Sequence, residues 1–580
     1  DLHPRFRRRV AERLSRRASA RRAWLDRAVR PVTRAGEGPT PSVAPPPEPG
    51  SESGGSGLSA GRVLVTASLI LTVAALASRI LGWIRLLVIG SQFGASRELD
   101  AYFAAFRIPD AIFQLVVAGA LSAALIPVFS SYRARGQEAE AWQLASSVIN
   151  LVLIALAVFS LVMAIFAPLF VPIVAPGFDA PTTELTIRMT RIMLISPVLI
   201  GMGAVVTGVL NSYQQFTVPA IAPLLYNLAI ILAAVFLAPI MGVEGLAVGV
   251  AIGSLAHLAV QLPNLARVGQ RYDLTIGLSH PGVRRVAWLM GPRTLGLAAG
   301  QINFLVSTVL ASGLPEGSLT AYNYAFQLSQ IPVGVIGVSI AVALFPTLSQ
   351  DAALGRIGEI RRQVVNAVRV LVFVAAPLTA IMIVLREPLT SVFYQYGLFS
   401  QSATERTAST LLFFAIGLVG HIVVHVLTRA FYAMQDTKTP VAWAIVAVAI
   451  NVPLMAMLVG PMGVEGLALA LSIAAVLEVI GLLWFLRRRI ESVDGAAIMR
   501  TVVRSGVAGL AAALLMLGGL TLLEGSLRGI LDNAVGRLVA LLLLSAAGAT
   551  IFVLVAAALH SPELDQLRGV LQRRRRGGNA

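Results

Sequence analysis

Long runs of apolar residues, separated by short polar stretches, recur along the chain from residue 63 onward. A transmembrane helix needs about 20 consecutive apolar residues, and most of these runs reach that length. The pattern predicts an all-α polytopic membrane protein with fourteen transmembrane helices. Their expected cores are 64–90, 101–131, 143–167, 185–211, 219–238, 244–266, 290–312, 319–348, 364–385, 408–432, 440–459, 464–486, 501–523 and 536–559.

The composition agrees with this pattern. Of the 580 residues, 56% are hydrophobic and only 13% are charged. Globular proteins carry about 25% charged residues, so an ordinary soluble enzyme is excluded. The chain has no cysteine, which excludes disulfides, thiolate metal sites and cysteine nucleophiles.

Basic residues give the chain a net charge of +17, and Lys438 is the only lysine among them. They gather in alternate connections and in both tails, so the positive-inside rule predicts that both termini are cytoplasmic. An anionic leaflet explains this balance better than nucleic acid does. The predicted cytoplasmic connections carry Arg133, Arg135, Arg267, Arg271, Arg284, Arg285, Arg356, Arg361, Arg362, Lys438 and Arg487–Arg489.

Residues 1–62 differ from the rest, with 13 arginines against 6 acidic residues. Phe6, Val10 and Leu14 recur at helical spacing among the arginines. This spacing fits a basic amphipathic helix on a membrane surface and, equally, a disordered arginine-rich tail. Residues 36–57 are rich in Pro, Gly and Ser, which is typical of a linker.

An internal repeat indicates the architecture. The segment 241–247, Met-Gly-Val-Glu-Gly-Leu-Ala, returns at 462–468. Because the offset covers an even number of spans, both copies insert in the same direction, as in transporters that alternate access around a central site. The expected domains are the tail 1–62, an N-lobe 63–288, a C-lobe 289–490, two further helices in 491–560 and a basic tail 561–580.

Arginines inside the spans are costly in hydrocarbon and normally face a cavity or a partner. Arg79 and Arg85 have no acidic residue within helical reach in their own span, which favours a water-filled cationic cavity. Arg188 could instead pair with Glu184, four residues earlier. Asp100 could pair with the first-span arginines or cap its own helix. The candidate substrate-binding charges are Arg79, Arg85, Asp100, Arg107, Arg188, Arg191 and Arg429.

The second lobe is polar but less basic on the matching surface. Gln327, the repeat counterpart of Arg107, and Gln330 are either cavity residues or interhelical hydrogen-bonding groups. His421 and His425 share one stripe with Arg429. No nearby carboxylate completes a zinc site, so packing or proton relay is favoured.

Glu478 lies deep in the twelfth span, and His257 is its repeat counterpart. An acid at that depth is a candidate for ion coupling, and a protonated structural acid is the alternative. No catalytic constellation, nucleotide-binding motif or metal motif accompanies it. We therefore expect a transporter without a cofactor or metal, driven by a gradient rather than by ATP.

Several segments resemble the MurJ (MviN) family of lipid II flippases. The similarity begins with Ser78-Arg79-Ile80-Leu81-Gly82-Trp83-Ile84-Arg85 and Asp100-Ala101-Tyr102-Phe103. Similar segments follow in the family's order, and they are Ala175-Pro176-Gly177-Phe178-Asp179, Leu314-Pro315-Glu316-Gly317-Ser318, Arg429-Ala430-Phe431-Tyr432-Ala433 and Asp436-Thr437-Lys438-Thr439-Pro440.

The resemblance covers roughly residues 63–560. It implies the fold of the multidrug/oligosaccharidyl-lipid/polysaccharide (MOP) exporters and movement of polyprenyl-diphosphate-linked peptidoglycan precursor across the membrane. Arg79 and Arg85 match the arginines that bind its headgroup, Asp100 matches an aspartate with a gating or pairing role, and the last two helices match those that form a groove for the polyprenyl tail.

The chain departs from the family at charged positions. Phe113, Gln114 and Ala118 stand where many members have charges in the second span, Gln327 replaces an arginine, and Ser307 replaces a sodium-binding aspartate. A flippase for another polyprenyl-linked glycan is therefore one alternative. A membrane scaffold that recruits cell-wall enzymes through its tails is another.

Overall fold

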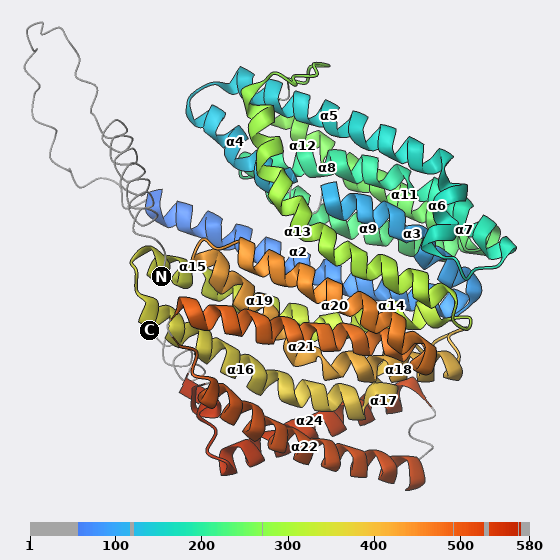
Figure 1. Ribbon diagram of the computed structural model, residues 1–580. Helices are drawn as coiled ribbons and strands as arrows, with labels where there is room; N and C mark the ends of the chain where they lie inside the picture. Colours follow the sequence, from blue (N-terminus) through green and yellow to red (C-terminus); the bar gives the residue numbers. More distant parts are fainter. Residues whose placement is uncertain are drawn as a thin grey trace, which may run out of the picture. The chain divides into compact units, whose positions relative to one another are not determined.

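A computed structural model describes residues 56–116, 121–269, 271–490, 492–526, 533–566 and 568–569 (Figure 1). Within the described helices, it gives no side-chain placement for 56–72, 115–116, 122–123, 291–299 and 526. Contacts divide the chain into Asp1–Val63 and one compact unit, Leu64–Ala580. The predicted amphipathic helix near Phe6 and the linker 36–57 lie outside the described residues. All regular structure in the described residues is helical.

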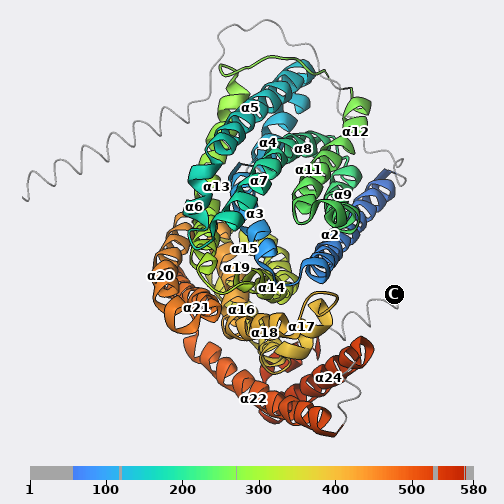
Figure 2. The same ribbon diagram turned by 90° about the vertical axis from the view of Figure 1, so that its right-hand side faces the viewer.

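The N-lobe is built from helices that run side by side in both views (Figures 1 and 2). Its elements are α2 (Ser56–Phe93), α3 (Arg97–Val116), α4 (Ser122–Ala134), α5 (Glu138–Ile165), α6 (Ala167–Val174), α7 (Ala180–Met193), α8 (Ile195–Ser212), α9 (Thr217–Phe236), α10 (Ala238–Met241), α11 (Glu244–Ala259) and α12 (Leu262–Arg267).

The C-lobe follows the same order of elements, and the two last long helices pack beside its α16. The C-lobe elements are α13 (Pro281–Ser312), α14 (Ser318–Pro332), the π-helix η2 (Val333–Val338), α15 (Ser339–Ala353), α16 (Ile357–Val384), α17 (Arg386–Tyr394), α18 (Gln401–Ile416), α19 (Leu418–Ala433), α20 (Lys438–Met462) and α21 (Val464–Arg489). The last two are α22 (Gly495–Ser526) and α24 (Ala534–Ala558).

Among the described residues, 11 helical segments are long and apolar enough to cross a membrane, or 12 if the bent pair α18–α19 is one span. The predicted spans 101–131 and 290–312 include residues whose backbone or side chains lie outside the description. Many large apolar side chains on the described helices are exposed, as lipid contact requires. The predicted fold class, a polytopic all-α protein with two lobes and two additional helices, is confirmed.

The two copies of the repeated segment make the same turn. Gly242 has a φ of +62° and Gly463 a φ of +63°, a left-handed conformation that favours glycine. The glutamate two residues later then reaches a neighbouring helix in each lobe. The Glu244 carboxylate accepts from Arg188 Nε at 2.6 Å, and the Glu465 carboxylate accepts from Ser409 Oγ at 2.6 Å. Ser409 is the repeat counterpart of Arg188, so this contact belongs to the shared architecture of the lobes.

A buried ion pair fixes the last helices to the C-lobe. Glu563, which follows α24, is 1% exposed and accepts from Arg369 of α16 at 2.7 Å and from Thr501 of α22 at 2.5 Å. Burial acts to raise the pKa of Glu563, but these hydrogen bonds outweigh it and hold the pKa below its ordinary value. The ionised carboxylate therefore joins three segments at one end of the fold.

Candidate functional site

The two lobes meet where α2 ends and where α3 and α14 begin; we call this the closed end. Asp100 of α3 is 2% exposed there. Its carboxylate accepts from the backbone N of Gly317 at 2.8 Å, and from the backbone N and Oγ1 of Thr320, each at 2.7 Å. A carboxylate at a helix N-terminus is favoured by the free N–H groups and by the helix dipole. Asp100 of the N-lobe thus caps α14 of the C-lobe.

Both partners expected for Asp100 are wrong. Its hydrogen bonds go neither to the first-span arginines nor to the start of its own helix, where Ser96 Oγ accepts from Leu99 N instead. Asp100 and Thr320 are repeat counterparts, so the N-termini of the equivalent helices α3 and α14 face each other. Local spacing within one lobe does not reveal a contact of this kind.

Further hydrogen bonds between the lobes surround Asp100. Leu398 N donates to Ser91 O at 2.7 Å, and Gly177 N donates to Ser312 Oγ at 3.1 Å. Arg97 N also donates to the carboxylate of Glu316 at 2.8 Å. The lobes are therefore held together across the whole of this end.

Arg107 continues the contact deeper between the lobes. Its Nε donates to Thr308 Oγ1 at 2.8 Å and its Nη2 donates to Asn323 Oδ1 at 2.5 Å. Its guanidinium carbon lies 5.1 Å from the ring centre of Phe304. The repeat offset of 220 residues, which would set Gln327 opposite Arg107, does not hold as a contact, because repeat counterparts occupy equivalent rather than facing positions. Gln327 is exposed, and Asn323, one turn earlier, is the partner.

Arg85 of α2 is half-buried and interacts electrostatically with Asp110 of α3. The neighbouring residue meets the C-lobe, because Tyr324 OH of α14 donates to Leu86 O at 2.7 Å. Asp110 interacts with Arg107 as well as with Arg85. Asp110 was not recognised from the sequence, although its position three residues after Arg107 on a helix could have revealed it. These residues form an arginine–aspartate cluster where the lobes meet.

Arg79 crosses from α2 to the C-lobe one and a half turns before Arg85. Its side chain is exposed, and its guanidinium lies against Gly334 in the π-helical turn η2. A Cβ atom at residue 334 would lie 2.7 Å from Arg79 Nη1. The missing side chain of Gly334 therefore makes room for the guanidinium. Single π-helical turns are frequent at functional sites.

The stripe on α19 faces the same region of the C-lobe. His425 lies beside η2, where a Cβ on Gly337 would be 3.5 Å from its ring. Arg429 Cζ lies 6.0 Å from the ring centre of Phe345 in α15. Among the described residues, no group of three or more histidine or acidic side chains is placed to hold a metal ion.

A polar pocket of about 230 Å³ lies inside the C-lobe. Glu478 of α21 and His421 of α19 line it, and His421 Nε2 is buried without a hydrogen-bond partner in the described residues. Gln330 and Asn303 also line it, and Asn451 Nδ2 donates to Asn303 Oδ1 at 3.0 Å. The structure thus places Glu478, His421 and Gln330 around one space. Asn303 and Asn451 were not recognised from the sequence.

His257 lies within the N-lobe, separate from this pocket. A Cβ on Gly203 would lie 2.8 Å from its Nδ1, and its carbonyl accepts from Gln261 Nε2 at 3.0 Å. Gln261 Oε1 in turn accepts from Thr207 Oγ1 at 2.8 Å. His257 and its repeat counterpart Glu478 therefore have different neighbours in the two lobes.

Arg188 and Arg191 are exposed and belong to other surroundings. Arg188 pairs with Glu244 at 2.6 Å and with Glu184 at 3.1 Å, as the helical-pairing interpretation predicted. Arg191 Nε donates to Ala164 O at 3.0 Å and lines an apolar groove between α5 and α8. Neither contact involves the arginine–aspartate cluster.

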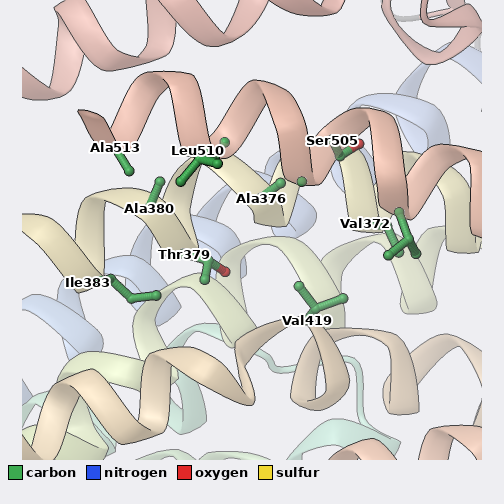
Figure 3. A pocket seen from close by; sticks show the side chains of 12 residues that line it. Val372, Ala376, Thr379, Ala380, Ile383, Val419, Ser505, Leu510 and Ala513 are labelled. Carbon is green, nitrogen blue, oxygen red and sulfur yellow. The ribbon is translucent and has the colours of Figure 1, made fainter. Parts of the chain in front are cut away.

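An apolar groove of about 490 Å³ lies between α16, α19 and α22 (Figure 3). Apolar side chains such as Val372, Ile383 and Leu510 line it. Thr379 and Ser505 add hydroxyl groups that have no hydrogen-bond partner in the described residues. The lining of the groove is apolar enough to accommodate a hydrocarbon chain.

Two parallel helical lobes that meet at charged, partly exposed side chains define the class of this protein as a membrane transporter of the MOP exporter type. A profile of the family described as lipid II flippase MurJ matches residues 89–531. The chain belongs to this family. It is a transporter, and no enzyme activity is expected of it.

Individual proteins agree with this assignment. The lipid II flippase MurJ of Burkholderia cenocepacia is 34% identical over 422 residues, which are 71% of this chain and 82% of that protein. The probable lipid II flippase MurJ of Bdellovibrio bacteriovorus is 32% identical over 463 residues, 78% of this chain and 88% of that protein. A relative described as probable lipid II flippase MurJ in Vibrio cholerae is 30% identical over 426 residues.

Solved structures agree in fold. A lipid II flippase MurJ in an inward closed conformation has a TM-score of 0.71 and 24% identity, and the match covers 85% of this chain and 99% of that chain. An inward-facing multidrug resistance MATE family transporter of the MOP superfamily has a TM-score of 0.64 and 16% identity, with 72% and 96% covered. At these identities, the likeness concerns the fold alone.

Proposed function

We propose that this protein moves lipid II, the polyprenyl-diphosphate-linked peptidoglycan precursor, from the inner to the outer leaflet of the bacterial inner membrane. Family membership supports this proposal, together with the names of relatives at 30–34% identity. The observation in the structure that carries it is the position of Arg85, which interacts with Asp110 of the N-lobe and adjoins Leu86, whose carbonyl accepts from Tyr324 OH of the C-lobe at 2.7 Å.

The chemistry of the cluster suits a diphosphate. Arginine donates two parallel hydrogen bonds to phosphate oxygens, and the pairing is strongest where water is scarce. Arg79 and Arg85 lie on the same helix, and the Arg79 guanidinium reaches Gly334 of the C-lobe, whereas Arg107 is already hydrogen-bonded between the lobes. We assign headgroup binding to Arg79 and Arg85, with Arg107 and Asp110 setting the local charge. Arg429, Gln327 and Gln330 complete the proposed polar surface.

The lipid tail of the cargo requires an apolar path outside the headgroup site. The groove between α16, α19 and α22 offers one, because its lining is almost entirely hydrocarbon (Figure 3). A headgroup between the lobes and a tail along α22 would let the polyprenyl chain remain in the membrane during transport.

The orientation follows from the distribution of arginines. With both tails in the cytoplasm, the closed end around Asp100 faces outward, and the structure corresponds to a state with its outer gate shut. Asp100 is then a gating residue rather than a headgroup ligand, because its carboxylate is occupied by Gly317 and Thr320.

The energy source acts, in this proposal, through the C-lobe pocket. Glu478 and His421 line the same space, and both have side chains that can bind a proton, with His425 one turn along α19. A change of protonation there would alter the packing of α19 against η2, next to Arg79. His257 is the candidate for a corresponding role in the N-lobe.

We also propose that the basic tails contact cell-wall synthesis proteins. A truncation lacking residues 1–57 should still move lipid II across the membrane but should lose those partners.

Lipid binding to the purified protein tests the proposal directly. Native mass spectrometry of protein titrated with lipid II should show a complex that Arg85→Ala weakens at least tenfold. Arg188→Ala is the matched control, because it removes an equally charged side chain that is paired with Glu184 and Glu244, and it should bind normally. If a different polyprenyl-linked glycan competes more strongly than lipid II, the cargo proposed here is wrong.

A further inference from the structure

The segment 271–280 connects the lobes without forming a helix, and it presents apolar side chains outward. Leu274 is 86% exposed, Ile276 54% and Leu278 65%. Three large aliphatic side chains at alternate positions of one short non-helical segment are unusual on a surface that faces only water. In Figure 1 this segment is the green irregular connection beside α5.

The polar backbone of this segment is turned towards α5. Ser146 Oγ accepts from Asp273 N at 3.1 Å, and Asn150 Nδ2 donates to Asp273 O at 3.0 Å and to Thr275 O at 2.9 Å. Tyr272 OH donates to Asn150 Oδ1 at 2.5 Å. Irregular backbone at membrane depth is stable only where protein groups satisfy its N–H and C=O groups. The side chains of Ser146 and Asn150 supply such hydrogen-bonding groups to the backbone of Asp273 and Thr275.

The segment also covers a polar part of α5. Ser146 is 1% exposed and Asn150 5% exposed beneath it. One turn further along the helix, about 6 Å from Asn150, the exposed surface of α5 becomes apolar at Ile154 and continues through Val158. The outward side chains of the segment therefore extend the apolar surface of a membrane span towards its basic end.

Basic and aromatic side chains surround the segment. Arg271 begins it, and Arg284 and Arg285 follow on the first turn of α13; all three are exposed. Arg285 Cζ lies 5.4 Å from the ring centre of Trp288, which is also exposed. Tryptophan and arginine together are typical of the headgroup level of a membrane, where an anionic leaflet attracts the cations.

We infer that residues 271–280 insert into the headgroup–acyl boundary of the membrane leaflet at the basic end of the fold, with Leu274, Ile276 and Leu278 in contact with lipid. The segment is an anchor for the connection between the lobes. Its last residue, His280, contacts Glu140 of α5 at 3.3 Å and caps α13 by accepting from Gly282 N. The anchor thus fixes the start of α13 to α5 and to the leaflet, while α13 leads into the C-lobe.

Fluorescence quenching in vesicles tests this inference, and the chain suits the method because it contains no cysteine. Leu274→Cys and Leu278→Cys, each labelled with an NBD fluorophore, would be reconstituted in phosphatidylcholine–phosphatidylglycerol vesicles that carry nitroxide-labelled lipids. Ser279→Cys leaves all three apolar side chains in place and provides an independent label position. Ala139→Cys, exposed in the first turn of α5, is the water control, and Ile154→Cys is the lipid control.

At the three positions in the segment, we expect blue-shifted emission and at least twofold stronger quenching by a nitroxide near the headgroup than by one deep in the acyl chain. Label at Ile154 should be quenched more by the deep nitroxide, and label at Ala139 by neither. If Ser279 and Leu274 labels behave like the Ala139 label while Ile154 remains quenched, the segment faces water or a protein partner, and the inference is wrong. This result does not depend on the identity of the cargo.

Discussion

The contact of Asp100 with α14 makes a quantitative prediction about the closed end. Asp100→Asn keeps the shape of the side chain but removes its charge and turns an amide N–H₂ towards Gly317 N or Thr320 N. One buried N–H then loses its acceptor, which costs about 1–3 kcal/mol, and the interaction with the helix dipole, about 0.3–1 kcal/mol, is lost. A weakening of about 1.3–4 kcal/mol shifts an equilibrium roughly 9- to 700-fold.

Spin-label distances measure this shift. Labels at Ala180 of the N-lobe and Ser402 of the C-lobe, both exposed near the closed end, should show one short distance in the parent protein. Asp100→Asn should add a population at longer distance. Asp179→Asn, an exposed acid that precedes α7 at the same end, is the matched control and should leave the distances unchanged. An Asp100→Asn distribution identical to that of the parent would refute the gating role of this contact.

Two further predictions concern other contacts. Gly334→Ala should push the Arg79 guanidinium away, since the new Cβ would lie 2.7 Å from its Nη1, and should reduce lipid II binding several-fold; Gly82→Ala, which has open space around it, should bind normally. Glu563→Ala should lower unfolding free energy by about 3–5 kcal/mol because it leaves Arg369 unpaired, as measured by thermal denaturation in detergent. In the parent, the stabilisation from the Glu563–Arg369 ion pair should be present above about pH 4.5 and decline as the pH falls further, because the pKa of the Glu563 carboxylate is lowered in the fold. A melting temperature of Glu563→Ala equal to that of the parent from pH 5 to 7 would contradict a stabilising role of this ion pair.

The repeated segments allowed the architecture to be predicted because the period of the repeat reports directly on the order and direction of helices. Gly242 and Gly463 make the same turn, and Glu244 and Glu465 reach the neighbouring helix in the same way. Arg188 also followed from local spacing, since a partner four residues away on a helix is near by geometry alone.

Contacts between the lobes could not be derived in this way. The partners of Asp100 and Arg107 lie more than 200 residues away in the sequence, and a repeat offset identifies equivalent positions rather than facing ones. The pairing of Asp110 with Arg107 was available from local spacing, but its interaction with Arg85 arises only after α2 and α3 have packed. The arginines were recognisable as unusual from their position in apolar spans, but which of them share a site depends on the packing of the helices.

The most direct test of the proposed function is the accessibility of lipid II in the native host. Cells depleted of this protein would be treated with an external enzyme that cleaves lipid II. The account predicts that lipid II accumulates and becomes resistant to cleavage, and that the parent chain restores cleavage while Arg85→Ala does not. Lipid II that stays fully cleavable after depletion, in a host without a second flippase, would contradict it.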